Sequence, residues 1–186
     1  MIELIFNIIH DIKETIQYLP VSILAGFFSF FLIPYYRRRP CGRRELAAFF
    51  GLVVFISLIL QIAFFSREPG SRDGIDLILF STWGDNAVSK AYVVENVLLF
   101  IPLGILLPLA VPFCQRGWWS AFFCLFLSCG LEFFQMVTGR GFCQIDDLWT
   151  NVLGGMAGFW IYRIFLSKRW EETSKERMNR HPDGFI

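Results

Sequence analysis

The chain has 186 residues, of which 55% are hydrophobic and 18% aromatic, and its formal net charge is +1. A soluble domain of this size cannot bury so much apolar surface, so the composition excludes an ordinary soluble protein and indicates a membrane protein. The net charge near zero gives no attraction to nucleic acid, so the expected partner is the lipid bilayer.

Residues 1–17 place isoleucine and phenylalanine at helical spacing, opposite Glu3, Asp11 and Glu14. This pattern predicts an amphipathic helix that lies in the membrane interface. The segment lacks the positive start and the small-residue cleavage site of a secretory signal, so we expect it to be retained.

Five apolar runs follow, and each is long enough to cross about 30 Å of hydrocarbon. They must be helical, because lipid offers no hydrogen-bond partner to an unpaired backbone group. The third run contains Pro102 and Pro108, which predict a kink rather than a break. The sequence therefore predicts an all-α, polytopic membrane protein, with a five-span domain over residues 18–166 and a charged tail over 167–186. The five spans are expected at residues 18–36, 46–65, 92–113, 118–137 and 148–166.

The basic residues give the expected orientation. Arginine and lysine accumulate in residues 37–44 and in the tail after residue 166, and such flanks mark the cytoplasmic side. With five spans, the N-terminus then lies outside the cell and the C-terminus lies in the cytoplasm. The turn at Arg116 falls inside, whereas residues 66–91 fall outside and mix both signs of charge.

The same topology separates the cysteines. Cys41 and Cys114 lie inside, Cys124 and Cys129 lie within a span, and Cys143 lies outside. No disulfide is therefore expected, and we expect these residues to act as small apolar side chains.

Charged and amide side chains interrupt the apolar sequence between Leu131 and Trp160 and at two earlier places. At membrane depth such groups cost several kcal/mol unless they pair or face water, so they form the candidate functional site. The predicted topology brings them to the outer ends of the helices. The expected binding residues are Arg67, Asn96, Glu132, Gln135, Arg140, Asp146, Asp147 and Asn151.

Spacing refines this prediction. Glu132 and Gln135 are three residues apart, and Asp147 and Asn151 four, so each pair shares one helix face. Asp146 and Asp147 also open a helix, where a carboxylate is favoured as a cap, and this alternative stays open, above all for Asp146. Glu132 lies about 7 Å inside its helix end, so it needs a proton or a cationic partner such as Arg140 or Arg67.

Glycines recur at close spacing after the polar cluster. Gly154, Gly155 and Gly158 give a G-x-x-x-G spacing, which lets a neighbouring helix approach closely. Gly104 on the third span is the expected partner. We therefore interpret these four glycines as helix-packing residues.

Several motifs together resemble the VanZ-like family. They are NVLLFIPLGILLP at 96–108, LEFFQ at 131–135, an arginine at 140, IDDLWTNVLGGMAG at 145–158 and FSR at 65–67. The resemblance covers about residues 46–166, and the chain departs from the family pattern after the second span, where it has IDLILFSTWGD. The resemblance implies a membrane protein connected with glycopeptide resistance, in particular to teicoplanin, without implying a reaction.

Three functions fit these residues. The first is a binding or shielding module whose outward cleft holds an anionic or amide-rich cell-envelope molecule, such as a lipid-linked wall precursor or the antibiotic, because arginines suit phosphate groups. The second is an intramembrane enzyme that uses Glu132 and Asp147 as acid and base. The third is a purely structural polar lock between helices.

The enzyme hypothesis has the weaker support in the sequence. No histidine falls in the cluster and no Ser-x-x-Lys or Gly-x-Ser-x-Gly nucleophile occurs, so whether the chain is an enzyme stays open. No cofactor or resident metal is expected, although Glu132, Asp146, Asp147 and Asn151 supply the oxygen atoms that a hard cation prefers. The chain has no internal repeat of the kind that marks many transporters.

Overall fold

The computed structural model describes residues 15–36, 43–65, 70, 74–76, 78–81, 87–141 and 143–167. The predicted interfacial helix lies outside the described residues except at its end, where Ile16–Tyr18 form a 3-10 turn. The tail after Ser167 and the candidate site residue Arg67 also lie outside them.

The described chain is mainly helical, and a long helix covers most of each predicted span. The helices are α2 (Leu19–Tyr36), α3 (Arg43–Leu60), α4 (Ala87–Ala110), α5 (Gly117–Thr138) and α6 (Ile145–Ile161). π-Helical turns extend α3 over Gln61–Phe65 and α6 over Tyr162–Leu166, and a 3-10 turn, Pro112–Gln115, joins α4 to α5. Two short strands, β1 (Ile75–Asp76) and β2 (Cys143–Gln144), pair in parallel, with Ile75 opposite Cys143.

Three helices begin at least three residues earlier than the apolar pattern predicted. α3 begins at Arg43 instead of residue 46, α4 at Ala87 instead of residue 92, and α6 at Ile145 instead of residue 148. The prediction followed hydrophobicity, whereas the first turns of these helices contain polar residues such as Lys90 and Asp146. α4 continues through both Pro102 and Pro108.

Three helical segments of the described residues are long and apolar enough to cross a membrane: Arg43–Phe64, Lys90–Ala110 and Gly117–Thr138. The chain is thus a helical membrane protein. α2 and α6 are not among these segments: the described apolar stretch at α2 is only Ile16–Phe31, and α6 has 17 residues before its π-helical turn.

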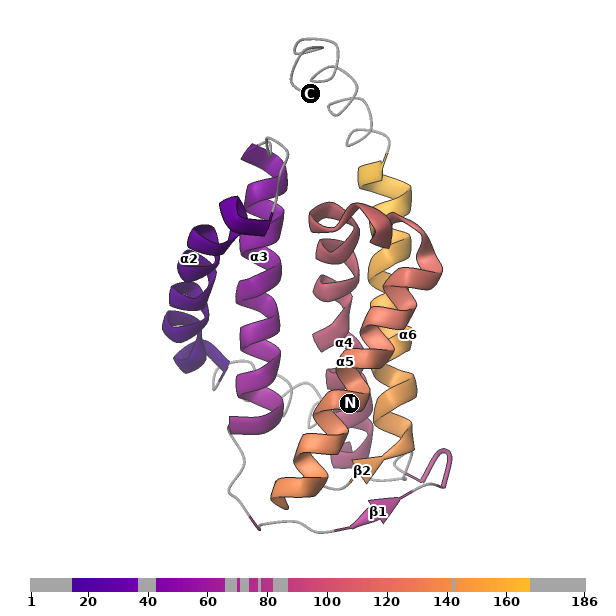
Figure 1. Ribbon diagram of the computed structural model, residues 1–186. Coiled ribbons are helices and arrows are strands. Elements are labelled where there is room, and N and C mark those ends of the chain that lie inside the picture. Colours follow the sequence, from indigo (N-terminus) through magenta and orange to yellow (C-terminus); the bar gives the residue numbers. More distant parts are fainter. Residues whose placement is uncertain are drawn as a thin grey trace, which may run out of the picture.

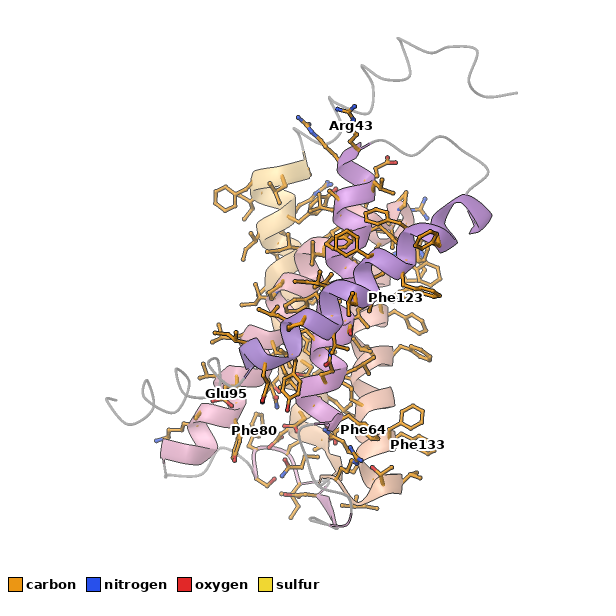
Figure 2. All side chains as sticks on the ribbon, turned by 90° about the vertical axis from the view of Figure 1, so that its left-hand side faces the viewer. Arg43, Phe64, Phe80, Glu95, Phe123 and Phe133 are labelled. Carbon is orange, nitrogen blue, oxygen red and sulfur yellow. The ribbon has the colours of Figure 1, made fainter. Side chains whose placement is uncertain are left out.

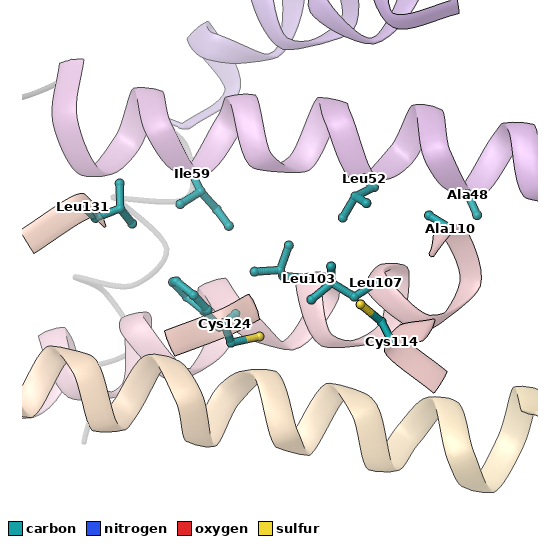
Figure 3. Close-up of a cluster of buried hydrophobic side chains, with 10 residues drawn as sticks. Ala48, Leu52, Ile59, Leu103, Leu107, Ala110, Cys114, Cys124 and Leu131 are labelled. Carbon is teal, nitrogen blue, oxygen red and sulfur yellow. The ribbon is translucent and has the colours of Figure 1, made fainter. Parts of the chain in front are cut away.

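The helices form a bundle in which α6 packs mainly against α4 and α5, and α3 joins the α2 side to α4 (Figure 1). Side chains of α3 and α4 meet in a buried apolar cluster with two cysteines (Figure 3). In lipid, such contacts stabilise through van der Waals packing, because the surrounding acyl chains are equally apolar. The buried members of the cluster are Ala48, Leu52, Ile59, Phe100, Leu103, Leu107, Ala110, Cys114, Cys124 and Leu131.

Glycines set the close approach of α4 and α6. A methyl group added at Gly104 would overlap the backbone carbonyl oxygen of Gly155. One added at Gly154 or Gly158 would overlap the carbonyl of Val97 or Ile101 of α4. The two backbones therefore touch at successive turns, and the polar first turns of α6 are fixed relative to the start of α4.

Candidate functional site

The candidate site residues that the structure describes gather at one end of the bundle, which we call the site end. It is formed by the end of α3, the start of α4, the end of α5, the start of α6 and the turn 74–81 that follows the loop after α3. Figure 2 shows Glu95, Phe80, Phe64 and Phe133 at this end and Arg43 at the opposite end. Four helices thus contribute to one polar region, as the sequence predicted for the outer ends of its spans.

Asn96 and Asp147 connect α4 to α6. The Asn96 side-chain amide donates to Oδ1 of Asp147 at 2.7 Å. A hydrogen bond to an ionised carboxylate is about twice as strong as one between neutral groups. The bond joins α4 and α6, the two helices that the glycines bring close together. The close contact between the two backbones therefore sets the distance between Asn96 and Asp147.

Glu132 binds the connection between α5 and α6. Its carboxylate is only 5% exposed, and Oε2 accepts the backbone N–H of Gln144 at 2.9 Å. The sequence analysis expected a proton or a cationic partner for Glu132, and the structure adds a backbone donor that only the fold could reveal. The Glu132 side chain therefore holds strand β2 close to the end of α5, the helix to which Glu132 belongs.

Gln135 and Arg140 hold the end of α3. The Gln135 amide donates to the carbonyl of Ala63 at 2.5 Å, and Nη1 of Arg140 donates to the carbonyl of Phe64 at 3.0 Å. The Arg140 guanidinium also lies 4.6 Å from the centre of the Phe64 ring, a cation–π distance. The last backbone carbonyls of a helix have no hydrogen-bond donor within the helix. The side chains of Gln135 and Arg140 act as donors to two of these carbonyls.

Asp146 binds the turn 74–81. Its Oδ1 accepts the backbone N–H of Phe80 at 2.7 Å, and the carboxylate is 3% exposed. Phe80 has a φ of 66°, a left-handed conformation that costs a non-glycine residue about 1–2 kcal/mol. The N-cap position of α6 is Gln144, whose side chain makes no capping bond, so the Asp146 carboxylate sits inside the first turn and ties a distant segment to it.

Asn151 lies one helical turn deeper than Asp147. Its amide donates to the Ser128 hydroxyl at 2.9 Å, and the residue is 5% exposed. Its carbonyl oxygen Oδ1 is buried and has no hydrogen-bond partner within the part of the chain that the structure describes. A buried acceptor in this state favours a neighbouring donor, such as a water molecule or an N–H or O–H group of a ligand.

The site end is acidic. Its described charged residues are the acids Asp76, Glu95, Glu132, Asp146 and Asp147 and the bases Lys90 and Arg140. Burial, followed by the charge of Glu132 and weaker effects of the Cys129 thiol and Asp147, raises the pKa of the Cys143 thiol in β2. No group of three or more His, Cys, Asp or Glu residues suited to a metal ion occurs within the described ranges.

The comparisons with known proteins fit this arrangement. Residues 46–166, more than half of the chain, match the profile of the family described as VanZ/LLP1. The chain belongs to the VanZ/LLP1 family. Protein VanZ of Enterococcus faecium is 38% identical over 72 residues, which are 38% of this chain and 44% of that relative, so the match spans less than half of either protein. No solved structure matches.

The family region contains every described member of the site end, from the last turn of α3 to Asn151 of α6. Sequence reasoning found the polar side chains but missed several of their partners. Ser128 sits in an apolar helix without any local sign of its role, and the Gln144, Ala63 and Phe64 partners are backbone groups, which a sequence does not distinguish.

Proposed function

We propose that this VanZ/LLP1 family member is a multi-pass protein of the bacterial plasma membrane, with five spans and its site end outside the cell. α2 and α6 are the two additional spans, because α6 with its π-helical turn reaches from Ile145 to Leu166 and packs along α4. Described arginines support the orientation: Arg43, Arg44, Arg116 and Arg163 all lie towards the end opposite the site.

The orientation predicts opposite labelling of two exposed positions. In intact cells, a membrane-impermeant maleimide is expected to modify a Lys90→Cys variant and to leave an Arg116→Cys variant unmodified until the membrane is opened. Peptide mass spectrometry reads each position separately, so the native cysteines can stay. Labelling of Arg116→Cys in intact cells, with Lys90→Cys protected, would show that the site end faces the cytoplasm.

We further propose that the site end binds an amide-rich cell-envelope molecule, either a lipid-linked wall precursor or a glycopeptide antibiotic, and that this binding contributes to glycopeptide resistance such as that to teicoplanin. The buried Asn151 carbonyl oxygen carries this proposal, because it has no hydrogen-bond partner among the described residues and such an acceptor favours a ligand that presents an N–H or O–H group. The excess of acids over bases among the described residues of the site end favours the same kind of ligand electrostatically. Arg140 already binds Phe64 of α3.

The test is binding to purified protein in lipid nanodiscs, measured with teicoplanin and with a lipid-linked wall precursor. An Asp147→Asn variant retains an oxygen that can accept from Asn96 but loses the charge, and we expect its affinity to fall about tenfold, equivalent to one strong charged contact. Glu45→Gln removes the same charge at the opposite end and should bind as the parent does. No binding of either molecule to the parent protein would refute the proposal.

A structural polar lock is the second candidate, and the hydrogen bonds favour it. Glu132, Gln135, Arg140 and Asp146 each bind the backbone of another segment. In this case Asp147→Asn would change resistance and the amount of folded protein together. In a binding protein, the same variant would lower resistance while its amount in the membrane stayed unchanged.

A further inference from the structure

The turn 74–81 presents large apolar side chains at the site end. Ile75, Ile78, Leu79 and Phe80 are 63, 72, 49 and 65% exposed. Exposed apolar residues on the helices of a membrane protein face acyl chains, but this group lies in a turn between helices. A contiguous exposed apolar patch of this kind marks a contact surface.

The polar side chains of Asp76 and Ser81 form their hydrogen bonds within the turn. Oδ1 of Asp76 accepts the N–H of Ile78 at 3.0 Å, and Oδ2 accepts the hydroxyl of Ser81 at 2.6 Å. Both carboxylate oxygens are thus used within the turn. The turn therefore exposes its apolar side chains while these polar side chains bind inside it, which suits the boundary between head groups and hydrocarbon.

The fold fixes the depth of the turn. Its start is held by the bond from Cys143 N–H to the Gly74 carbonyl, at 3.0 Å, and its end by the bond from Phe80 N–H to Asp146. Asp146 precedes Trp149 by three residues, which is about 4.5 Å along the axis of α6. Trp149 is 58% exposed, and exposed Trp residues at helix ends favour the boundary between head groups and hydrocarbon. Figure 1 shows the turn beside this end of α6.

We propose that the turn 74–81 inserts its apolar side chains into the lipid leaflet on the side of the site end, with acyl chains as the occupant of the exposed patch. The lipid-facing surface of α6, which includes Trp149 and Leu153, continues into this patch through the Asp146–Phe80 bond. The left-handed Phe80 backbone directs the chain into this position, and Asp146 holds it there. The inference concerns the lipid contact and holds for either orientation of the protein.

The test uses thiol labelling in lipid nanodiscs that hold one copy of the full chain, where both faces meet water. Variants Ile78→Cys and Leu79→Cys are treated with a charged maleimide, and peptide mass spectrometry follows each position. We expect both to react at least tenfold more slowly than Lys90→Cys, an exposed position at the same end, and all three to react alike after denaturation. Elution of each variant as the parent in gel filtration shows that it is folded.

Two results would overturn the inference. Labelling of positions 78 and 79 at the rate of Lys90→Cys in single-copy discs would place the turn in water. Fast labelling in single-copy discs combined with protection in liposomes crowded with protein would show that a second copy of the chain, rather than lipid, covers the patch.

Discussion

Replacement of Gly104 by leucine is expected to prevent accumulation of folded protein. The added side chain would collide with the backbone of α6 at Gly155, which cannot move aside as a flexible side chain can. Overpacking in an ordinary core costs about 1–3 kcal/mol, and a collision with backbone should cost about 3 kcal/mol or more. Thermal unfolding in detergent and the yield of monodisperse protein measure the effect.

Gly130 is the matched control for this substitution. It lies in the middle of α5, and a methyl group added there meets no atom within 4 Å. Gly130→Leu should therefore fold as the parent does, with a gain of up to about 1 kcal/mol from the higher helix propensity of leucine. Equal losses in both variants would mean that the approach of α4 and α6 is not what limits stability.

Replacement of Glu132 by alanine is expected to lower the free energy of unfolding by about 1–3 kcal/mol. The substitution removes the acceptor of the buried Gln144 N–H and leaves that donor without its carboxylate partner. Glu132→Gln keeps an acceptor oxygen and should lose less than half as much. Chemical or thermal unfolding in mild detergent gives the comparison.

The neighbouring Phe133 provides the control on the same helix. Its side chain is 56% exposed on the outer surface of α5, and its truncation to alanine should change stability by no more than about 0.5 kcal/mol. If Glu132→Ala proved as stable as Phe133→Ala, the Glu132–Gln144 bond would contribute nothing to the fold.

The helices were predictable because long apolar runs in lipid have only helical solutions. The first residues of the helices were harder to predict, because hydrophobicity does not show that the polar turns at Lys90 and Asp146 are helical. The clustering of Asn96, Glu132, Asp147 and Asn151 at one end also followed from the sequence, because the order of the spans fixes which ends meet. Whether these residues bind a ligand stays a prediction.

Partners at the site end could not be predicted in the same way. The bond from Phe80 to Asp146 joins residues 66 positions apart and depends on a left-handed backbone at a phenylalanine, a conformation that no residue preference favours. Gln144 and Ala63 contribute only backbone groups to these contacts, and Phe64 contributes its carbonyl and its ring. Such contacts depend on the path of the chain, which short-range patterns do not specify.

The use of backbone groups at the site end has a consequence for the evolution of this family. A carbonyl or N–H is offered by almost any amino acid, so positions 63, 80 and 144 can change identity while the side chains at 132, 135 and 146 cannot. Among relatives, we therefore expect residues 132, 135 and 146 to be invariant, with no covarying residue at the positions that they contact. Methods that infer spatial proximity from paired substitutions would overlook this end of the bundle.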